Sequence, residues 1–214
     1  NSGNIMNSKD RIIVSLGRQL GSGGYFVGKM IASALGLFFY DKELLYHAAK
    51  ESGLCEDIFE KADEKVSQGL SRVLNAHDFF GGAFFDPQNA TLSRDHIFNI
   101  QSQVILKLSE EQSCLFIGRC SDYILRNNPR MRSFFIHAPL SLRIANVAER
   151  KGISRDEAES FIAREEKKRA AYYNYFTGKE WGKADSYHFT LDAGLLGVEG
   201  CARAAVALIR ESLD

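Results

Sequence analysis

A glycine-rich segment near the N-terminus carries the residues best suited to chemistry. An apolar run at residues 11–16 leads into Gly17-Arg18-Gln19-Leu20-Gly21-Ser22-Gly23-Gly24, and residues 25–35 then show apolar residues at helical spacing. A strand, a glycine loop and a helix in this order point several backbone N–H groups and a helix N-terminus at one anion. Glycine suits such a loop because it reaches unusual φ/ψ values and lets phosphate oxygens approach the backbone. We therefore interpret the segment as a phosphate-binding loop formed by Gly17, Arg18, Gly21, Ser22, Gly23 and Gly24.

This loop departs from the strict phosphate-loop signature G-x-x-x-x-G-K-[ST]. Gly24 stands where the lysine is expected, and Tyr25 and Phe26 follow it in place of the hydroxyl that would hold Mg²⁺. We hypothesise that the Arg18 guanidinium supplies the missing charge. Lys29 is a poor substitute, because five residues along a helix rotate it by roughly 140° from the expected direction.

The loop has two other interpretations. One is a glycine-rich turn that binds no ligand. The other is a loop that binds a dinucleotide. Asp41 at the end of the next apolar run would support this interpretation. The sequence disfavours it because Phe26 stands at the last glycine of G-x-G-x-x-G and the connection is long for that tight turn.

Further charged residues follow the apolar runs or lie on a predicted helix. Arg119 and Asp41 each follow an apolar run, and a charged helical segment carries Arg164, Lys168 and Arg169. Guanidinium groups fork onto phosphate oxygens, so arginine is the expected residue for gripping them. Each also has a simpler interpretation: a surface arginine for Arg119, a helix N-cap for Asp41, and a solvated helix face for the three cations.

Strand and helix patterns alternate along the chain. Strands are predicted at residues 11–16, 37–40, 114–118, 132–137 and 187–191, and helices at 25–35, 42–51, 58–76, 95–110, 121–125, 141–151, 155–175 and 198–213. This alternation predicts an α/β protein with a parallel sheet and helices on both of its faces. Ligands of such folds bind at the carboxyl ends of the strands. The phosphate loop, Asp41, Arg119 and His137 all fall there, although a structural role is favoured for His137.

We predict that residues 11–214 form a single domain, preceded by a disordered tail or expression remnant at residues 1–10. Residues 42–99 form a long excursion between the second and third strands, and residues 155–183 form a charged helix that leads into Thr177-Gly178-Lys179-Glu180-Trp181-Gly182. The excursion includes an aromatic, glycine-bearing patch at residues 79–85. We interpret this patch as a loop that covers core, with a flap over a planar substrate as the alternative.

Composition excludes several classes of protein. The chain has 214 residues, 45% of them hydrophobic, and 27 basic and 27 acidic side chains. Zero net charge argues against a broad nucleic-acid footprint, and no apolar run approaches the length of about 20 residues needed to cross a bilayer. We expect a cytoplasmic protein, because the first ten residues lack a signal peptide's apolar segment and the four cysteines show no paired spacing. Cys114 and Cys201 are expected to be small core residues.

Five segments together resemble the cytidylate kinase-like family of P-loop nucleoside monophosphate kinases. They are residues 17–24, 39–45, 116–119 and 136–143, and the helix with Lys168-Arg169 and Tyr172-Tyr173. The similarity extends over nearly the whole chain. It implies a three-layer P-loop NTPase-type fold with a central parallel sheet, an acceptor-binding excursion at residues 42–99 and a short lid at residues 155–183. It also implies ATP as donor, Mg²⁺ as cofactor and a nucleoside monophosphate, CMP or dCMP, as acceptor.

The resemblance further implies roles for particular residues. Arg119 would grip the acceptor phosphate, Asp41 would open the acceptor-binding segment, and the cations of the lid would close over the donor phosphates. The predicted catalytic residues are accordingly Arg18, Arg119, Arg164, Lys168 and Arg169. No protein residue is assigned as a metal ligand.

The chain also departs from the better-characterised branch of this family. It lacks the loop lysine and hydroxyl, and Leu45, Tyr46 and His47 stand near the place of an arginine beyond the aspartate. Two other functions therefore stay open: a non-catalytic protein that binds nucleotides or anions, and a kinase of another small phosphate acceptor. The expected partners are small-molecule nucleotides, without nucleic acid or membrane, and the sequence leaves the oligomeric state open.

Overall fold

A computed structural model describes residues 11–51 and 94–213 of the chain. The chain divides into two compact units, one made of residues 1–39 and 112–214 and the other of residues 40–111. The helix predicted at residues 58–76, the aromatic patch at 79–85 and the tail at 1–10 lie outside the described residues.

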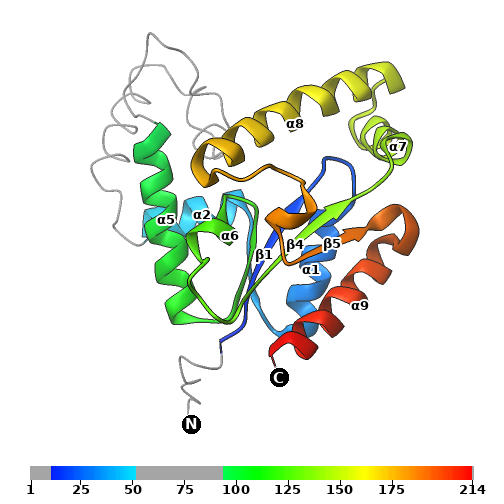
Figure 1. The fold of residues 1–214 in the computed structure, drawn as a ribbon. Helices are drawn as coiled ribbons and strands as arrows, with labels where there is room; N and C mark the ends of the chain where they lie inside the picture. Colours follow the sequence, from blue (N-terminus) through cyan, green and yellow to red (C-terminus); the bar gives the residue numbers. More distant parts are fainter. Residues whose placement is uncertain (1–10, 52–93, 214) are drawn as a thin grey trace. The chain divides into compact units, whose positions relative to one another are not determined.

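The larger unit is built on a five-stranded sheet with the order β2-β3-β1-β4-β5 (Figure 1). The strands are β1 (Ile13–Arg18), β2 (Phe38–Tyr40), β3 (Cys114–Ile117), β4 (Met131–His137) and β5 (Phe189–Asp192). β1 pairs in parallel with β3 and with β4, and β4 pairs in parallel with β5. The carboxyl ends of these strands therefore meet at one edge of the sheet, which confirms the predicted α/β fold.

One face of the sheet is covered by α1 (Gly24–Leu35) and α9 (Ala193–Leu213), which lie side by side (Figure 1). Alternate residues of the central strands point into this layer, so that Val14 and Leu16 are fully buried against it. Cys201 of α9 belongs to the same core. Cys114 and Cys201 are both fully buried, as predicted.

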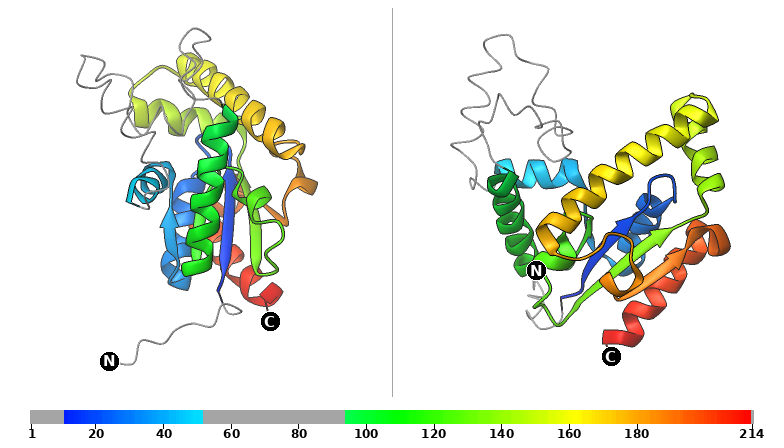
Figure 2. Two further views of the ribbon diagram at one scale, coloured as in Figure 1. Left: turned by 90° about the vertical axis from the view of Figure 1, so that its left-hand side faces the viewer. Right: turned by 45° about the horizontal axis from the view of Figure 1, so that its top comes forward.

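The opposite face of the sheet carries the short helix α6 (Ser121–Ile124), which contacts β1 and β4. Beyond β4, α7 (Leu140–Lys151) packs on α8 (Arg155–Thr177) through a small apolar core. A capping box of Ser154 and Glu157 starts α8. Figures 1 and 2 show α8 crossing the end of the sheet at which β1 and β4 end.

The smaller unit, as far as it is described, consists of α2 (Lys42–Glu51) and α5 (Arg94–Glu111), which pack on each other. Both helices match predicted ones. This unit contains the described parts of the predicted excursion.

The C-terminal strand and helix differ from their predicted bounds. Residues 187 and 188 precede β5, because Tyr187 ends a 3₁₀ turn (Ala184–Ser186) and its ring packs on the aromatic rings of Phe135 and Tyr173. α9 starts at residue 193 instead of 198, because the Asp192 carboxylate accepts a 2.7 Å hydrogen bond from the N–H of Gly194. Gly197 (φ 68°, ψ 174°) then interrupts the helix, so only the part beyond it follows the apolar periodicity.

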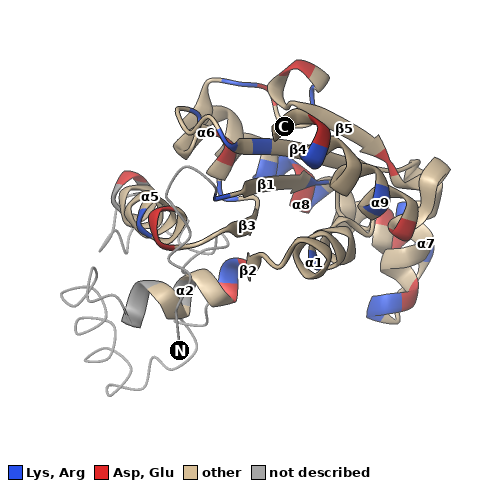
Figure 3. Ribbon diagram, turned by 90° about the horizontal axis from the view of Figure 1, so that it is seen from below, with Lys and Arg blue, Asp and Glu red and all other residues tan. Residues whose placement is uncertain are grey.

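Basic and acidic residues are interspersed along the described helices (Figure 3), in agreement with the balanced composition. In the described part of the chain, no helix is both long and apolar enough to span a membrane.

Candidate functional site

The glycine loop connects the end of β1 to the start of α1 at the carboxyl edge of the sheet. Gly21 (φ 82°) and Gly23 (φ 78°) both adopt left-handed backbone conformations, which explains why glycine occupies these positions. The carbonyl oxygen of Gly23 accepts hydrogen bonds from the N–H groups of Phe26 (2.9 Å) and Val27 (3.1 Å), so α1 begins directly at the loop. The positive end of this helix therefore points toward the loop, as an anion site requires.

Ser22 holds the loop together from within. Its hydroxyl donates to the carbonyl oxygen of Gln19 (2.9 Å) and accepts from the N–H of Gly24 (3.3 Å), and the residue is buried. Gly17 has a packing role, because a Cβ there would lie 2.8 Å from the ring of Phe135.

The Arg18 side chain extends from the start of α1 to the turn after β3. A Cβ on Gly24 would lie 2.6 Å from the Cβ of Arg18, and a Cβ on Gly118 would lie 2.7 Å from Arg18 Nη1. A side chain at position 24 and the side chain of Arg18 thus compete for the same space. The chain carries an arginine at 18 and no lysine at 24, and this geometry gives a physical reason for that combination.

Replacing Gly24 with alanine is expected to destabilise the protein by about 1–3 kcal/mol, which is typical of overpacking. The added methyl group would lie 2.6 Å from Arg18 Cβ and 3.2 Å from Ile136 Cβ, neither of which is the free end of a flexible side chain. Urea denaturation measures the effect. Adding Arg18→Gly to Gly24→Ala should recover part of the loss, and a single variant as stable as the wild type would contradict the packing described.

Three consecutive residues after β3 adopt left-handed backbone conformations: Gly118 (φ 71°), Arg119 (φ 61°) and Cys120 (φ 55°). Two of them are not glycine, and such residues store backbone strain that the surrounding structure must hold. Ser121 provides this support, because its N–H (3.2 Å) and its hydroxyl (2.9 Å) both reach the carbonyl oxygen of Gly118. Arg119 is therefore presented from a rigid, strained turn next to the Arg18 guanidinium.

A buried carboxyl group lies directly beyond this turn. Asp122 is only 4% exposed, and the hydroxyl of Tyr173 in α8 donates a 2.7 Å hydrogen bond to its Oδ2. Burial raises the pKa of Asp122 above its ordinary value of 3.8, and the hydrogen bond from Tyr173 opposes that shift. No local pattern links these two residues, which are 51 positions apart in the sequence.

The raised pKa of Asp122 has a consequence for stability. The folded protein binds this proton more tightly than the unfolded chain does, so the group stabilises the fold most at low pH, and that contribution is lost as the pH rises from 3.8 through the raised pKa. We expect Asp122→Asn, which keeps an oxygen acceptor for Tyr173, to gain stability relative to the wild type as the pH rises above 3.8. Urea denaturation across this range tests it; identical pH profiles for the two proteins would contradict the expectation.

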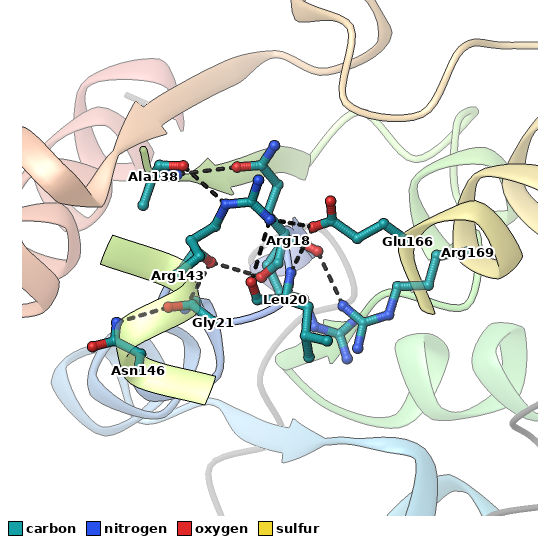
Figure 4. A network of polar contacts seen from close by, with 11 residues as sticks. Arg18, Leu20, Gly21, Ala138, Arg143, Asn146, Glu166 and Arg169 are labelled. Atoms are coloured by element: carbon teal, nitrogen blue, oxygen red, sulfur yellow. Dashed lines mark hydrogen bonds and ion pairs between the residues drawn. The ribbon is translucent and has the colours of Figure 1, made fainter. Parts of the chain in front are cut away.

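The outer side of the glycine loop is held by polar side chains of α7 and α8 (Figure 4). Arg143 donates to the carbonyl oxygens of Ala138 (3.0 Å) and Leu20 (3.4 Å), and Asn146 donates to that of Gly21 (2.8 Å). Glu166 Oε1 accepts from the N–H of Leu20 (2.9 Å) and from Arg143 Nη1 (2.8 Å). These contacts fix the backbone of the loop at Leu20 and Gly21.

The three predicted lid cations do not share one environment. Arg169 donates to the carbonyl oxygen of Arg18 (3.4 Å), and burial lowers its pKa while the neighbouring Glu166 opposes the shift. Arg164 and Lys168 lie on an exposed face of α8, where both pair with Glu165 at 3.5 Å and 3.0 Å. The structure therefore brings Arg18, Arg119 and Arg169 to the loop and its neighbouring turn, and holds Arg164 and Lys168 in surface ion pairs.

Asp41 belongs to the smaller unit, where it caps a helix. Its Oδ1 accepts hydrogen bonds from the N–H groups of Glu43 (3.1 Å) and Leu44 (3.0 Å) at the start of α2. This arrangement matches the helix-cap interpretation of the residue.

A cavity of about 440 Å³ opens beside the loop at the carboxyl ends of β4 and β5. It is lined by Gln19, Phe135, His137, Ala138, Pro139, Gly182, Ala184, Thr190 and Asp192. Gln19 belongs both to this lining and to the loop, because its Oε1 accepts from the N–H of Ala138 (3.1 Å). The predicted strand-end residue His137 thus faces a polar cavity.

The residues around the loop do not fit a protein-held magnesium site. The hydroxyl of Ser22 is engaged within the loop, and Tyr25 packs its ring edge-on against Phe26 and Phe39 at 5.7 Å and 5.5 Å. Within residues 11–51 and 94–213, no three His, Cys, Asp or Glu side chains gather in a way that could hold a metal ion.

Comparisons with known proteins identify the family and the fold of the chain. The model of the cytidylate kinase-like family matches residues 13–194. Among solved structures, the chain resembles an uncharacterized protein from Eubacterium ventriosum, with a TM-score of 0.70, 24% identity, and 94% of this chain and 99% of that chain covered. No curated protein matches the chain in sequence.

Two structures of P-loop kinases share the fold at lower identity. A shikimate kinase from Bacteroides thetaiotaomicron has a TM-score of 0.52 and 13% identity, with 93% of this chain and 98% of that chain covered. A gluconokinase from Sinorhizobium meliloti has a TM-score of 0.52 and 15% identity, with 94% and 92% covered. At these identities the likeness concerns the fold alone, which is of the P-loop NTPase type.

Proposed function

The chain belongs to the cytidylate kinase-like family, and we propose that it transfers the γ-phosphoryl group of ATP to a nucleoside monophosphate, CMP or dCMP. In this reaction an oxygen of the acceptor phosphate forms a bond to the γ-phosphorus, and the bond from that phosphorus to the β,γ-bridging oxygen breaks. The products are ADP and a nucleoside diphosphate. Membership of a kinase-like family and the P-loop kinase fold support a phosphotransferase, and the choice of acceptor rests on the family.

One observation carries the proposal: the Arg18 side chain joins the glycine loop to the turn that presents Arg119. Phosphoryl transfer demands positioning and neutralisation of charge more than covalent chemistry from the protein. We assign the loop N–H groups and the start of α1 to the donor phosphates, Arg18 to the transferring group and Arg119 to the acceptor phosphate. These assignments place positive charge along the line between the two substrates.

Magnesium, when bound with the nucleotide, would neutralise phosphate charge. Mg²⁺ commonly keeps several water ligands and is held largely by substrate phosphates. Because the loop offers no fitting side-chain oxygen for it, we assign the protein's share of charge neutralisation to the arginines.

A coupled assay of ADP release tests the proposal, with ATP and Mg²⁺ against CMP, dCMP, UMP, AMP and GMP. Turnover that depends on CMP or dCMP is the expected result. Turnover with none of the five by a folded protein would overturn it, and calorimetry with ATP would then show whether nucleotide binding remains.

A second candidate is a protein that binds nucleotides or anions without turnover. It is favoured by the aromatic contacts of Tyr25, which occupy the place where the P-loop signature puts the magnesium-binding hydroxyl. ATP binding without ADP release in the same panel would support this candidate.

A further inference from the structure

The inward face of α8 contacts both halves of the candidate site. Ile162, Glu166, Arg169 and Tyr173 follow one another at helical spacings of four, three and four residues, so they lie on one side of the helix. Ile162 anchors this face in the core shared with α7. The outward side carries the exposed ion pairs of Glu165.

The first half of the site is the phosphate loop, which α8 reaches through Glu166. The carboxylate accepts from the N–H of Leu20 (2.9 Å) and from Arg143 (2.8 Å), and Arg143 is itself bonded to the loop through the carbonyl oxygen of Leu20. The side chains of Arg143 and Glu166 are 7% and 17% exposed, so water competes little for these bonds. Hydrogen bonds to charged groups in such a setting are among the stronger ones.

The second half is the turn that presents Arg119, which α8 reaches through Tyr173. The Tyr173 hydroxyl donates to the buried carboxyl of Asp122 (2.7 Å) at the start of α6. The three left-handed residues of the turn immediately precede α6, so the position of this helix determines that of the turn. Asp122 and Ser121 therefore hold the strained backbone from its C-terminal side.

We propose that Glu166 and Tyr173 are positioning residues through which α8 sets the donor loop and the acceptor arginine in place relative to one another. Tyr173 follows Glu166 by seven positions on one rigid helix, and this spacing corresponds to about two helical turns. Glu166 acts on the donor side through Leu20 and Arg143, and Tyr173 acts on the acceptor side through Asp122. This inference rests on the proposed function for its assignment of donor and acceptor.

Two variants test the proposal, because each is expected to raise the KM of a different substrate. Glu166→Gln is expected to raise KM for ATP about tenfold and to leave KM for the monophosphate near the wild-type value, because one charged hydrogen-bond acceptor is lost at the loop. Tyr173→Phe is expected to show the reverse pattern, with KM for the monophosphate raised about tenfold. Equal effects of both variants on the two KM values, or effects on kcat alone, would overturn the proposal.

Matched controls lie on the same helix. Glu159→Gln makes the same chemical change at an exposed position, and Tyr175→Phe does so at a tyrosine that is 62% exposed. Both controls should keep wild-type KM values. Since Glu166→Gln leaves the buried Arg143 without its carboxylate, Glu166→Asp is a second variant that keeps the charge and shortens the reach to Leu20.

Hydrogen exchange separates a failure of this inference from a failure of the proposed function. Without any nucleotide, Glu166→Gln should speed amide exchange in residues 17–24 selectively, and Tyr173→Phe should do so in residues 117–123. This readout does not depend on turnover. Unchanged or uniformly faster exchange would overturn the positioning role, whereas the expected pattern in a protein without kinase activity would contradict only the proposed function.

Discussion

Replacing Arg18 with alanine is expected to lower kcat/KM by about 10²- to 10³-fold, the loss typical of removing one group that stabilises developing charge. The expectation follows from the path of this side chain, which passes Gly24 and brings its guanidinium to Gly118. No lysine in the loop can share the task, because position 24 is a glycine. Steady-state kinetics with ATP and CMP measure the effect, with circular dichroism to confirm folding.

Lys29→Ala is the matched control for Arg18→Ala. The Lys29 ammonium lies 5.0 Å from the centre of the Tyr25 ring and 6.0 Å from that of Phe39, in cation–π contacts away from the loop. Its removal should change kcat/KM by less than about threefold, since exposed cation–π contacts contribute about 0.5–1 kcal/mol. A larger loss for Lys29→Ala than for Arg18→Ala would refute the assignment of Arg18.

Arg119→Ala should lower kcat/KM for the monophosphate by about 10²-fold, because a forked guanidinium on a phosphate is worth several kilocalories per mole in a shielded site. The effect should appear mainly in KM for the acceptor, with the affinity for ATP retained. Arg119→Lys should rescue it only in part, since an ammonium group cannot reproduce the fork geometry. Acceptor-dependent kinetics and calorimetry with ATP measure the two sides separately.

Arg126→Ala provides the comparison for Arg119. Arg126 lies just beyond α6, donates to the carbonyl oxygen of Tyr123 (2.7 Å) and packs 4.2 Å from the centre of that ring. Its loss should leave the kinetics unchanged. If Arg119→Ala retained the wild-type KM for every monophosphate tested, Arg119 would be a structural residue of the turn.

The α/β fold and the position of the glycine loop between β1 and α1 were predictable from local patterns. Apolar runs rich in β-branched residues predicted the central strands, and helical spacing predicted α1, α5, α7 and α8 to within a few residues. The start of α9 was not predictable in this way. Its first turn depends on the Asp192 cap and precedes the interruption at Gly197, so it carries no continuous apolar periodicity.

Helix α8 shows where local patterns stop being informative. Arg164 and Lys168 are four residues apart, a spacing that puts them on one side of a helix, and both pair with Glu165 at the surface. The same pattern could not tell which side of α8 faces the loop. That depends on the packing of Ile162 and Ala158 against α7, which turns Glu166 and Arg169 inward.

The sequence by itself determined the order of strands and helices along the chain, the glycine loop after β1 and the arginines that we propose for phosphate binding. It did so because strand and helix periods, and the backbone freedom of glycine, are properties of neighbouring residues. Only the tertiary structure decided that Arg18 lies between Gly24 and Gly118, that Glu166 meets Leu20 and that Tyr173 meets Asp122. Apart from Arg18 and Gly24, these partners are far apart in the chain, and they come together only because packing of the helices on the sheet sets their mutual positions.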